Sequence, residues 1–209
     1  MNLITSYAKI KNNKVFVNGT EVFYADPTAS LSEFLSEAYK ALGASYPKFH
    51  KMDLQCKLGF ICTEFALKGT DFLAENDLSK TAIVLSNAAS SLETDRQHQH
   101  SIDDKSNYFP SPAVFVYTLP NIVIGELAIK YKITGENAFF VSDKFDPELL
   151  LNYTESLLAN GSEAAICGWV EVDGANYEAF IFLAETPKNI NKISIFKPLN
   201  QLTVLDLYK

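Results

Sequence analysis

Apolar residues along this chain fall into two alternating patterns: short continuous runs of strand length, and longer runs with the spacing of a helix. The strand-like runs are rich in β-branched and aromatic residues, whereas the others repeat with a helical period. This alternation predicts an α/β fold in which helices pack against a sheet. Strands are predicted at 15–17, 21–24, 81–85, 138–141, 164–172, 177–184, 193–196 and 202–205, and helices at 30–42, 54–68, 91–103, 121–131 and 147–160.

Turn and cap residues mark where these elements end. Asn18-Gly19 and Asp173-Gly174 are dipeptides typical of tight hairpin turns. Gly43 follows a helical run and predicts its end. Pro112 predicts a helix start, and Pro120 interrupts the apolar stretch that follows, so this region is predicted to be a broken helix.

The composition is that of one folded domain spanning residues 1–209, because 47% of the residues are apolar and 12% are aromatic. No apolar run approaches the ~20 residues of a membrane span, and residues 1–14 lack an apolar stretch after their charges. We therefore expect neither a transmembrane helix nor a secretory signal. The net charge of −7 argues against nucleic acid as a partner and disfavours non-specific binding to anionic membranes.

The chain has three cysteines, Cys56, Cys62 and Cys167. An odd number at such wide spacing argues against a disulfide framework. They fit a reducing cytoplasm, and we expect them to be small buried residues. His98 and His100 stand two apart on a predicted helix and so point to different faces, which disfavours a metal site. We expect a cytoplasmic protein without a metal or other cofactor.

The most informative segment runs from Ser111 to Ser142. Within it, Leu119-Pro120-Asn121, Gly125 and Gly135-Glu136-Asn137 precede a predicted strand. This block resembles the run that leads into the active-site cysteine of β-ketoacyl-acyl-carrier-protein synthases. Residues 15–19 (as a first strand), 51–53 with the helix 58–68, 81–92 and 161–172 resemble further segments of that family, in the same order. The resemblance covers the amino-terminal half of a ketosynthase and implies a thiolase-like fold with a mixed central sheet flanked by helices.

The resemblance places Lys144 where the family has its nucleophilic cysteine. There a thiolate, activated by the amino end of a helix, attacks an acyl thioester. Residues 142–146 contain no cysteine. The family's activating histidines lie in the second half of its duplicated fold, and His50, His98 and His100 of this chain match none of them. We therefore expect no ketosynthase chemistry from this chain alone, and we favour a protein that is not an enzyme.

Lys144 itself has two interpretations. In a desolvated pocket at a helix end its amine would be able to form an amide or a Schiff base. Alternatively it is a solvated lysine beside Asp143 and Asp146. We favour the second, because Asp146-Pro147 predicts a helix that begins too late to direct its positive end at position 144.

Binding functions remain open in two places. Lys48, His50 and Lys51 correspond to a basic segment that in the family contacts the acidic acyl carrier protein, although an ordinary solvated loop explains them as well. Pro120, Asn121 and Ser142 resemble the family's segment near the dimer interface and the acyl pocket. Core packing explains these residues equally well.

Three functions follow from the resemblance. The first is a non-catalytic, ketosynthase-like accessory subunit in fatty-acid, polyketide or polyene-type biosynthesis, which pairs with an active ketosynthase subunit or an acyl carrier protein. The second is a stand-alone module that binds acyl groups or carrier proteins. The third is a half-enzyme completed in trans by a separate chain. Half of a duplicated fold is expected to expose an apolar face, so we predict a homodimer or a complex with a ketosynthase.

Overall fold

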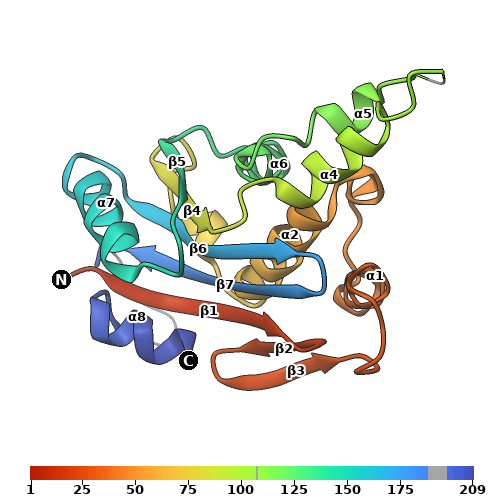
Figure 1. Cartoon of the computed structure of the whole chain (residues 1–209). Helices are drawn as coiled ribbons and strands as arrows, with labels where there is room; N and C mark the ends of the chain where they lie inside the picture. Colours follow the sequence, from red (N-terminus) through yellow and green to blue (C-terminus); the bar gives the residue numbers. More distant parts are fainter. Residues whose placement is uncertain (107, 188–196) are drawn as a thin grey trace.

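The polypeptide folds around one mixed β-sheet that helices cover on both faces (Figure 1). The computed structural model describes residues 1–106, 108–187 and 197–209. The strand order is β3-β2-β1-β7-β6-β4-β5, and β8 pairs with β1 beside this path. The predicted α/β class, with a mixed central sheet flanked by helices, is confirmed.

The elements have the following bounds. The strands are β1 (Leu3–Lys11), β2 (Lys14–Val17), β3 (Thr20–Tyr24), β4 (Thr81–Asn87), β5 (Asn137–Val141), β6 (Ala164–Asp173), β7 (Asn176–Glu185) and β8 (Lys197–Pro198). The helices are α1 (Leu31–Leu42), the short 3₁₀ helix η1 (Pro47–Lys51), α2 (Leu54–Leu67), α3 (Phe72–Glu75), α4 (Leu92–His100), α5 (Pro112–Phe115), α6 (Ile122–Tyr131), α7 (Pro147–Ala159) and α8 (Gln201–Tyr208).

The direction of the strands divides the sheet into two parts. β4 runs parallel to both of its neighbours, β5 and β6. The remaining pairs, from β6 through β7, β1 and β2 to β3, are antiparallel. The carboxyl ends of β4 and β5 therefore meet at the same edge of the sheet, and β3 and β5 form its two outer strands.

Two apolar clusters lie on opposite faces of the sheet. The larger one packs α1, α2 and α6 against residues such as Ile10, Ile83 and Ile181. The smaller one packs α7 and α8 against residues such as Val84 and Phe182. Adjacent strand residues such as Ile83 and Val84 belong to different clusters because successive side chains of a strand point to opposite faces.

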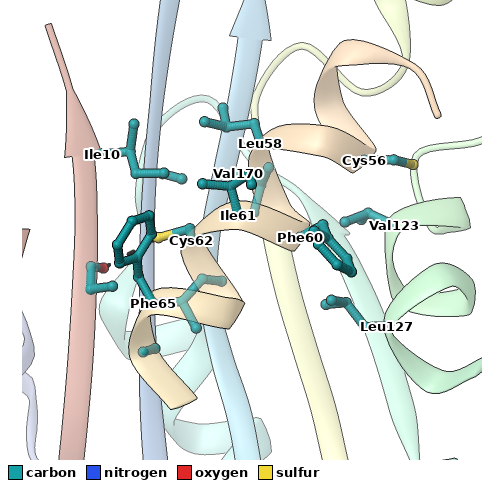
Figure 2. Packing of buried hydrophobic residues seen from close by; sticks show 14 of the residues in the cluster. Ile10, Cys56, Leu58, Phe60, Ile61, Cys62, Phe65, Val123, Leu127 and Val170 are labelled. Carbon is teal, nitrogen blue, oxygen red and sulfur yellow. Dashed lines mark hydrogen bonds between the residues drawn. The ribbon is translucent and has the colours of Figure 1, made fainter. Parts of the chain in front are cut away.

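Helix α2 lies at the centre of the larger cluster and is buried on nearly all sides, since eleven of its 14 residues are buried. Figure 2 shows Cys62 directed toward Ile10 of β1, and Phe60 directed toward Val123 and Leu127 of α6. Gly59 permits this close approach, because a Cβ at that position would lie 2.6 Å from Val123 Cγ2.

Most local predictions are confirmed. Asn18 and Gly19 have φ values of 53° and 86° and connect β2 to β3, as a tight hairpin turn requires. Ser30 and Glu33 form a capping box at the start of α1, and Gly43 ends that helix in the left-handed conformation. The break at Pro120 separates α5 from α6.

One strand was missed and one predicted strand is wrong. Residues 15–17 do form a strand, β2, but it is the second of the chain. The first is β1 at Leu3–Lys11, which was missed because Thr5 and Ser6 interrupt its apolar pattern even though both are buried. Residues 202–205 lie in helix α8, where the side chain of Asn200 caps the first turn by accepting from the Thr203 N–H. The predicted strand at 193–196 lies outside the described residues.

Helix α8 covers part of the smaller cluster with Val204 and Leu207, and the centre of the Tyr208 ring lies 4.2 Å from that of Phe145. Much of the exposed apolar surface lies elsewhere, because five large exposed apolar side chains fall within residues 108–119. They are Tyr108, Phe109, Phe115, Val116 and Leu119.

Candidate functional site

The segment that follows β5 occupies the place where the sequence predicted a lost nucleophile. The Ser142 N–H donates to the carbonyl of Asn87 at the end of β4, at 2.9 Å, so the two parallel strands end together. The Ser142 hydroxyl donates to the carbonyl of Lys144 at 3.0 Å. This hydroxyl is therefore engaged in closing the turn that leads into α7.

Lys144 lies on the outside of that turn. Its side chain is exposed, whereas the next residue, Phe145, is buried against Trp169 and Tyr208. Helix α7 begins at Pro147, and the carboxylate of Asp146 caps it by accepting from the Leu149 N–H at 3.0 Å. A capping carboxylate offsets the positive end of the helix, so this geometry offers little activation to a group at position 144.

A second polar group surrounds Glu126 on α6. Its side chain is only 7% exposed, and the ammonium group of Lys48 from η1 lies 3.2 Å from its carboxylate. The hydroxyl of Tyr117 donates to the same carboxylate at 3.2 Å. Burial and the negative charge of Glu126 both raise the pKa of Tyr117, so this hydroxyl stays protonated as a donor.

Asp53 joins the start of α2 to α4 close to this group. One oxygen of its carboxylate accepts from the Cys56 N–H at 2.8 Å and caps α2, and the other accepts from the Thr94 hydroxyl at 2.7 Å.

Burial, followed by the charge of Asp53, raises the pKa of the Cys56 thiol well above its usual value. Burial likewise raises the pKa of Cys167, to about 12. A neutral buried thiol is a poor nucleophile, so these cysteines act as core residues, as expected.

The predicted docking residues fall into two kinds. Lys48 is held by Glu126, as described above. His50 and Lys51 are exposed on η1, and the His50 ring lies edge-on to Phe49 at 5.7 Å. The ammonium group of Lys57 on α2 lies over the Phe49 ring, 5.9 Å from its centre. Phe49 itself is buried and fixes the basic segment to the core.

Pro120 and Asn121 lie at the start of α6. The side-chain amide of Gln55 donates to the Pro120 carbonyl at 3.4 Å, and Asn121 is exposed. Within residues 1–106, 108–187 and 197–209, no hydrogen bond or ion pair joins either residue to Ser142. Their shared role in an acyl pocket therefore remains a prediction.

The two histidines of α4 lie apart from any cluster of metal-ligand side chains among the described residues. His98 packs against Phe115 at 5.3 Å, and His100 is exposed. Among the described residues, no group of three or more His, Cys, Asp or Glu side chains is arranged to hold a metal ion. No helix in those ranges is both long enough and apolar enough to span a membrane.

Sequence reasoning missed the Lys48–Glu126–Tyr117 group. The available signal was Glu126 itself, a single acid in the otherwise apolar start of the 122–131 run. A charge in such a run is rarely buried unless it is paired. Its partner Lys48 is 78 positions away, which no local pattern reveals.

Comparison with known proteins shows similarity at the level of structure. No protein-family model matches the chain, and no curated protein matches it significantly. The ishigamide ketosynthase/chain length factor superposes with a TM-score of 0.66 and 16% identity, over 93% of this chain and 64% of that one. AntDE:AntF is a type II PKS acyl-carrier protein in complex with its ketosynthase bound to the hexaketide. It superposes with a TM-score of 0.63 and 14% identity, over 90% of this chain and 62% of that one.

A third similar structure is the ketosynthase ApeO in complex with its chain length factor ApeC from Xenorhabdus doucetiae. It gives a TM-score of 0.56 and 17% identity, over 89% of this chain and 79% of the matched one. The chain thus spans less than two thirds of the length of the first two structures. It has the thiolase-like fold of ketosynthases and chain length factors, as the sequence resemblance implied.

Proposed function

We propose that this chain is a non-catalytic, ketosynthase-like accessory subunit that pairs with an active ketosynthase in fatty-acid, polyketide or polyene-type biosynthesis. The observation that carries the proposal is Lys144, which takes the place of the nucleophilic cysteine in the sequence resemblance and is exposed. Its neighbour Asp146 caps the following helix. Position 144 thus carries no thiol that could form the acyl thioester of the ketosynthase reaction.

Pairing with another subunit is supported by apolar surface near α5. This short helix packs against α4 and stands away from the sheet (Figure 1). Five large apolar side chains within residues 108–119 are exposed, and Phe109 reaches 77% exposure. A concentration of exposed apolar side chains is typical of interaction surfaces. We infer that this surface contributes to the contact with a ketosynthase, or with a second copy in a homodimer.

An acyl carrier protein is the second proposed partner. His50 and Lys51 are exposed on η1, with Lys57 close by on α2. On a chain of net charge −7, such a local basic surface lowers the repulsion that an acidic partner otherwise meets. The three free cysteines support the further proposal of a reducing, cytoplasmic location.

Affinity purification of the tagged chain from its native cells, followed by mass spectrometry and light scattering, tests the pairing. We expect an intact ketosynthase in stoichiometric amount, with or without an acyl carrier protein. A stable homodimer that contains neither would refute the accessory-subunit proposal.

A second experiment tests the missing chemistry. The purified chain is incubated with an acyl-thioester donor and analysed by intact mass, alone and together with the co-purified ketosynthase. We expect acyl groups on the ketosynthase and none on this chain. An acyl adduct on this chain that disappears in Lys144→Ala would show that position 144 is reactive and would overturn the non-catalytic assignment.

A further inference from the structure

A groove lies at the β3 side of the sheet, between the β2–β3 hairpin and helices α1 and α2. Its volume is about 270 Å³. Five of its lining residues are apolar and come from all four elements, and the sixth is a lysine at the end of α2. The lining residues are Val17, Val22, Phe23, Ala41, Phe65 and Lys68.

The groove is lined by a buried aromatic residue at its base and by exposed apolar residues where it opens to solvent. Phe65 is 4% exposed and forms part of the core, whereas Val22 is 48% exposed and Ala41 is also exposed. An apolar chain in the groove would therefore cover surface that now faces water, which is favourable in proportion to the area removed from water.

Lys68 gives the groove a single positive charge. It is exposed at the carboxyl end of α2, and no ion pair or side-chain hydrogen bond joins it to another residue in the described ranges. The other five lining residues carry no charge. The groove thus presents one cation beside an apolar surface, which is complementary to a ligand with one anionic head and one apolar tail.

We propose that this groove binds a medium-chain fatty carboxylate, with the alkyl chain along Val17, Val22 and Phe65 and the carboxylate at Lys68. The volume lies just below the ~300–1,000 Å³ range of small-molecule sites, which suits one alkyl chain rather than a multi-ring ligand.

This site is separate from the region considered for an acyl pocket. The groove is built on β2 and β3, and Ser142 follows β5, which is the outer strand at the opposite side of the sheet (Figure 1). The inference therefore does not depend on the proposed accessory function, and either one can fail alone.

Two-dimensional amide NMR of the full chain, titrated with hexanoate, octanoate, decanoate and dodecanoate below their micelle concentrations, tests the proposal. We expect saturable shifts at Val17, Val22 and Phe23. Affinity should rise about three- to fourfold for each added methylene until the groove is full. 1-Dodecanol, which lacks the charge, should bind more weakly than dodecanoate by about threefold or more.

Matched variants separate the groove from general surface effects. Lys68→Glu should weaken dodecanoate binding about tenfold, whereas Lys105→Glu makes the same charge change at an exposed position outside the groove and should have no effect. Ala41→Trp should fill the groove and abolish saturable binding, with Ala74→Trp, on an exposed position of α3, as its control.

Four results would each overturn the assignment: no saturable binding by any chain length, equal binding of dodecanol and dodecanoate, equal effects of each variant and its control, or shifts that map to Ser142 instead. The amide spectrum of each variant also reports whether it has folded.

Discussion

Replacing Lys48 by methionine should destabilise the fold, although the sequence suggested a docking role for this lysine. The substitution keeps most of the apolar stem and removes the ammonium group that lies 3.2 Å from the carboxylate of Glu126. The carboxylate would then keep the hydroxyl of Tyr117 as its hydrogen-bond donor. A largely buried charge without its counter-ion is unfavourable.

The expected size follows from the exposure of the two partners. At 3.2 Å, two unit charges attract by about 1 kcal/mol in water and by about 5 kcal/mol at an effective dielectric constant of ~20. Lys48 is 49% exposed and Glu126 is 7% exposed, so the pair lies between these limits, and the desolvation of Glu126 offsets much of the attraction. We expect Lys48→Met to lower the free energy of unfolding by about 1–2 kcal/mol.

Urea unfolding followed by the fluorescence of the single tryptophan, Trp169, measures this change. Lys51→Met on the same 3₁₀ helix is the control, because Lys51 is exposed and should change stability by no more than about 0.5 kcal/mol. In a Glu126→Gln background the cost of Lys48→Met should fall by about 1 kcal/mol, since the buried charge is then gone.

Equal costs for Lys48→Met and Lys51→Met, or the same cost of Lys48→Met in both backgrounds, would refute this reasoning. The same variants bear on docking. Glu126 already balances the charge of Lys48, so Lys51→Met should weaken binding of an acidic carrier protein more than Lys48→Met does.

Three further predictions concern two glycines, position 144 and Tyr131. Gly135→Ala should lower the free energy of unfolding, measured in urea, by about 1–3 kcal/mol, because its Cβ would lie 2.3 Å from the carbonyl oxygen of Thr81. Gly125→Ala on α6 meets no atom within 4 Å and should raise the free energy of unfolding by about 0.5–1 kcal/mol. Lys144→Cys should give an exposed thiol that thioester donors acylate no faster than free cysteine, as measured by intact mass. Burial and the charge of Glu64 raise the pKa of Tyr131. The stability that its protonated hydroxyl contributes should therefore be complete below about pH 10 and be lost as the pH rises further. Tyr131→Phe should reduce that loss when the free energy of unfolding in urea is measured against pH.

The candidate site was predicted in part. The absence of a cysteine from residues 142–146 can be read directly from the sequence, and the Asp146-Pro147 pair correctly indicated where α7 begins. The sequence did not separate Lys48 from Lys51, because both are lysines in one short basic segment. Only the packing of α6 beside η1 brings Glu126 to Lys48 and makes one a counter-ion while the other stays exposed.

The sequence by itself determined the local events of this fold. The hairpin at Asn18-Gly19, the cap at Ser30 and the break at Pro120 each depend on the backbone preferences of a few neighbouring residues. Tertiary structure alone decided the order of the strands and the form of the last segment. β1 pairs with β7, so that Leu3 lies opposite Glu185, and α8 forms where its apolar residues can cover the sheet. Such contacts join residues that are distant in the chain, and their energy depends on partners that no local pattern contains.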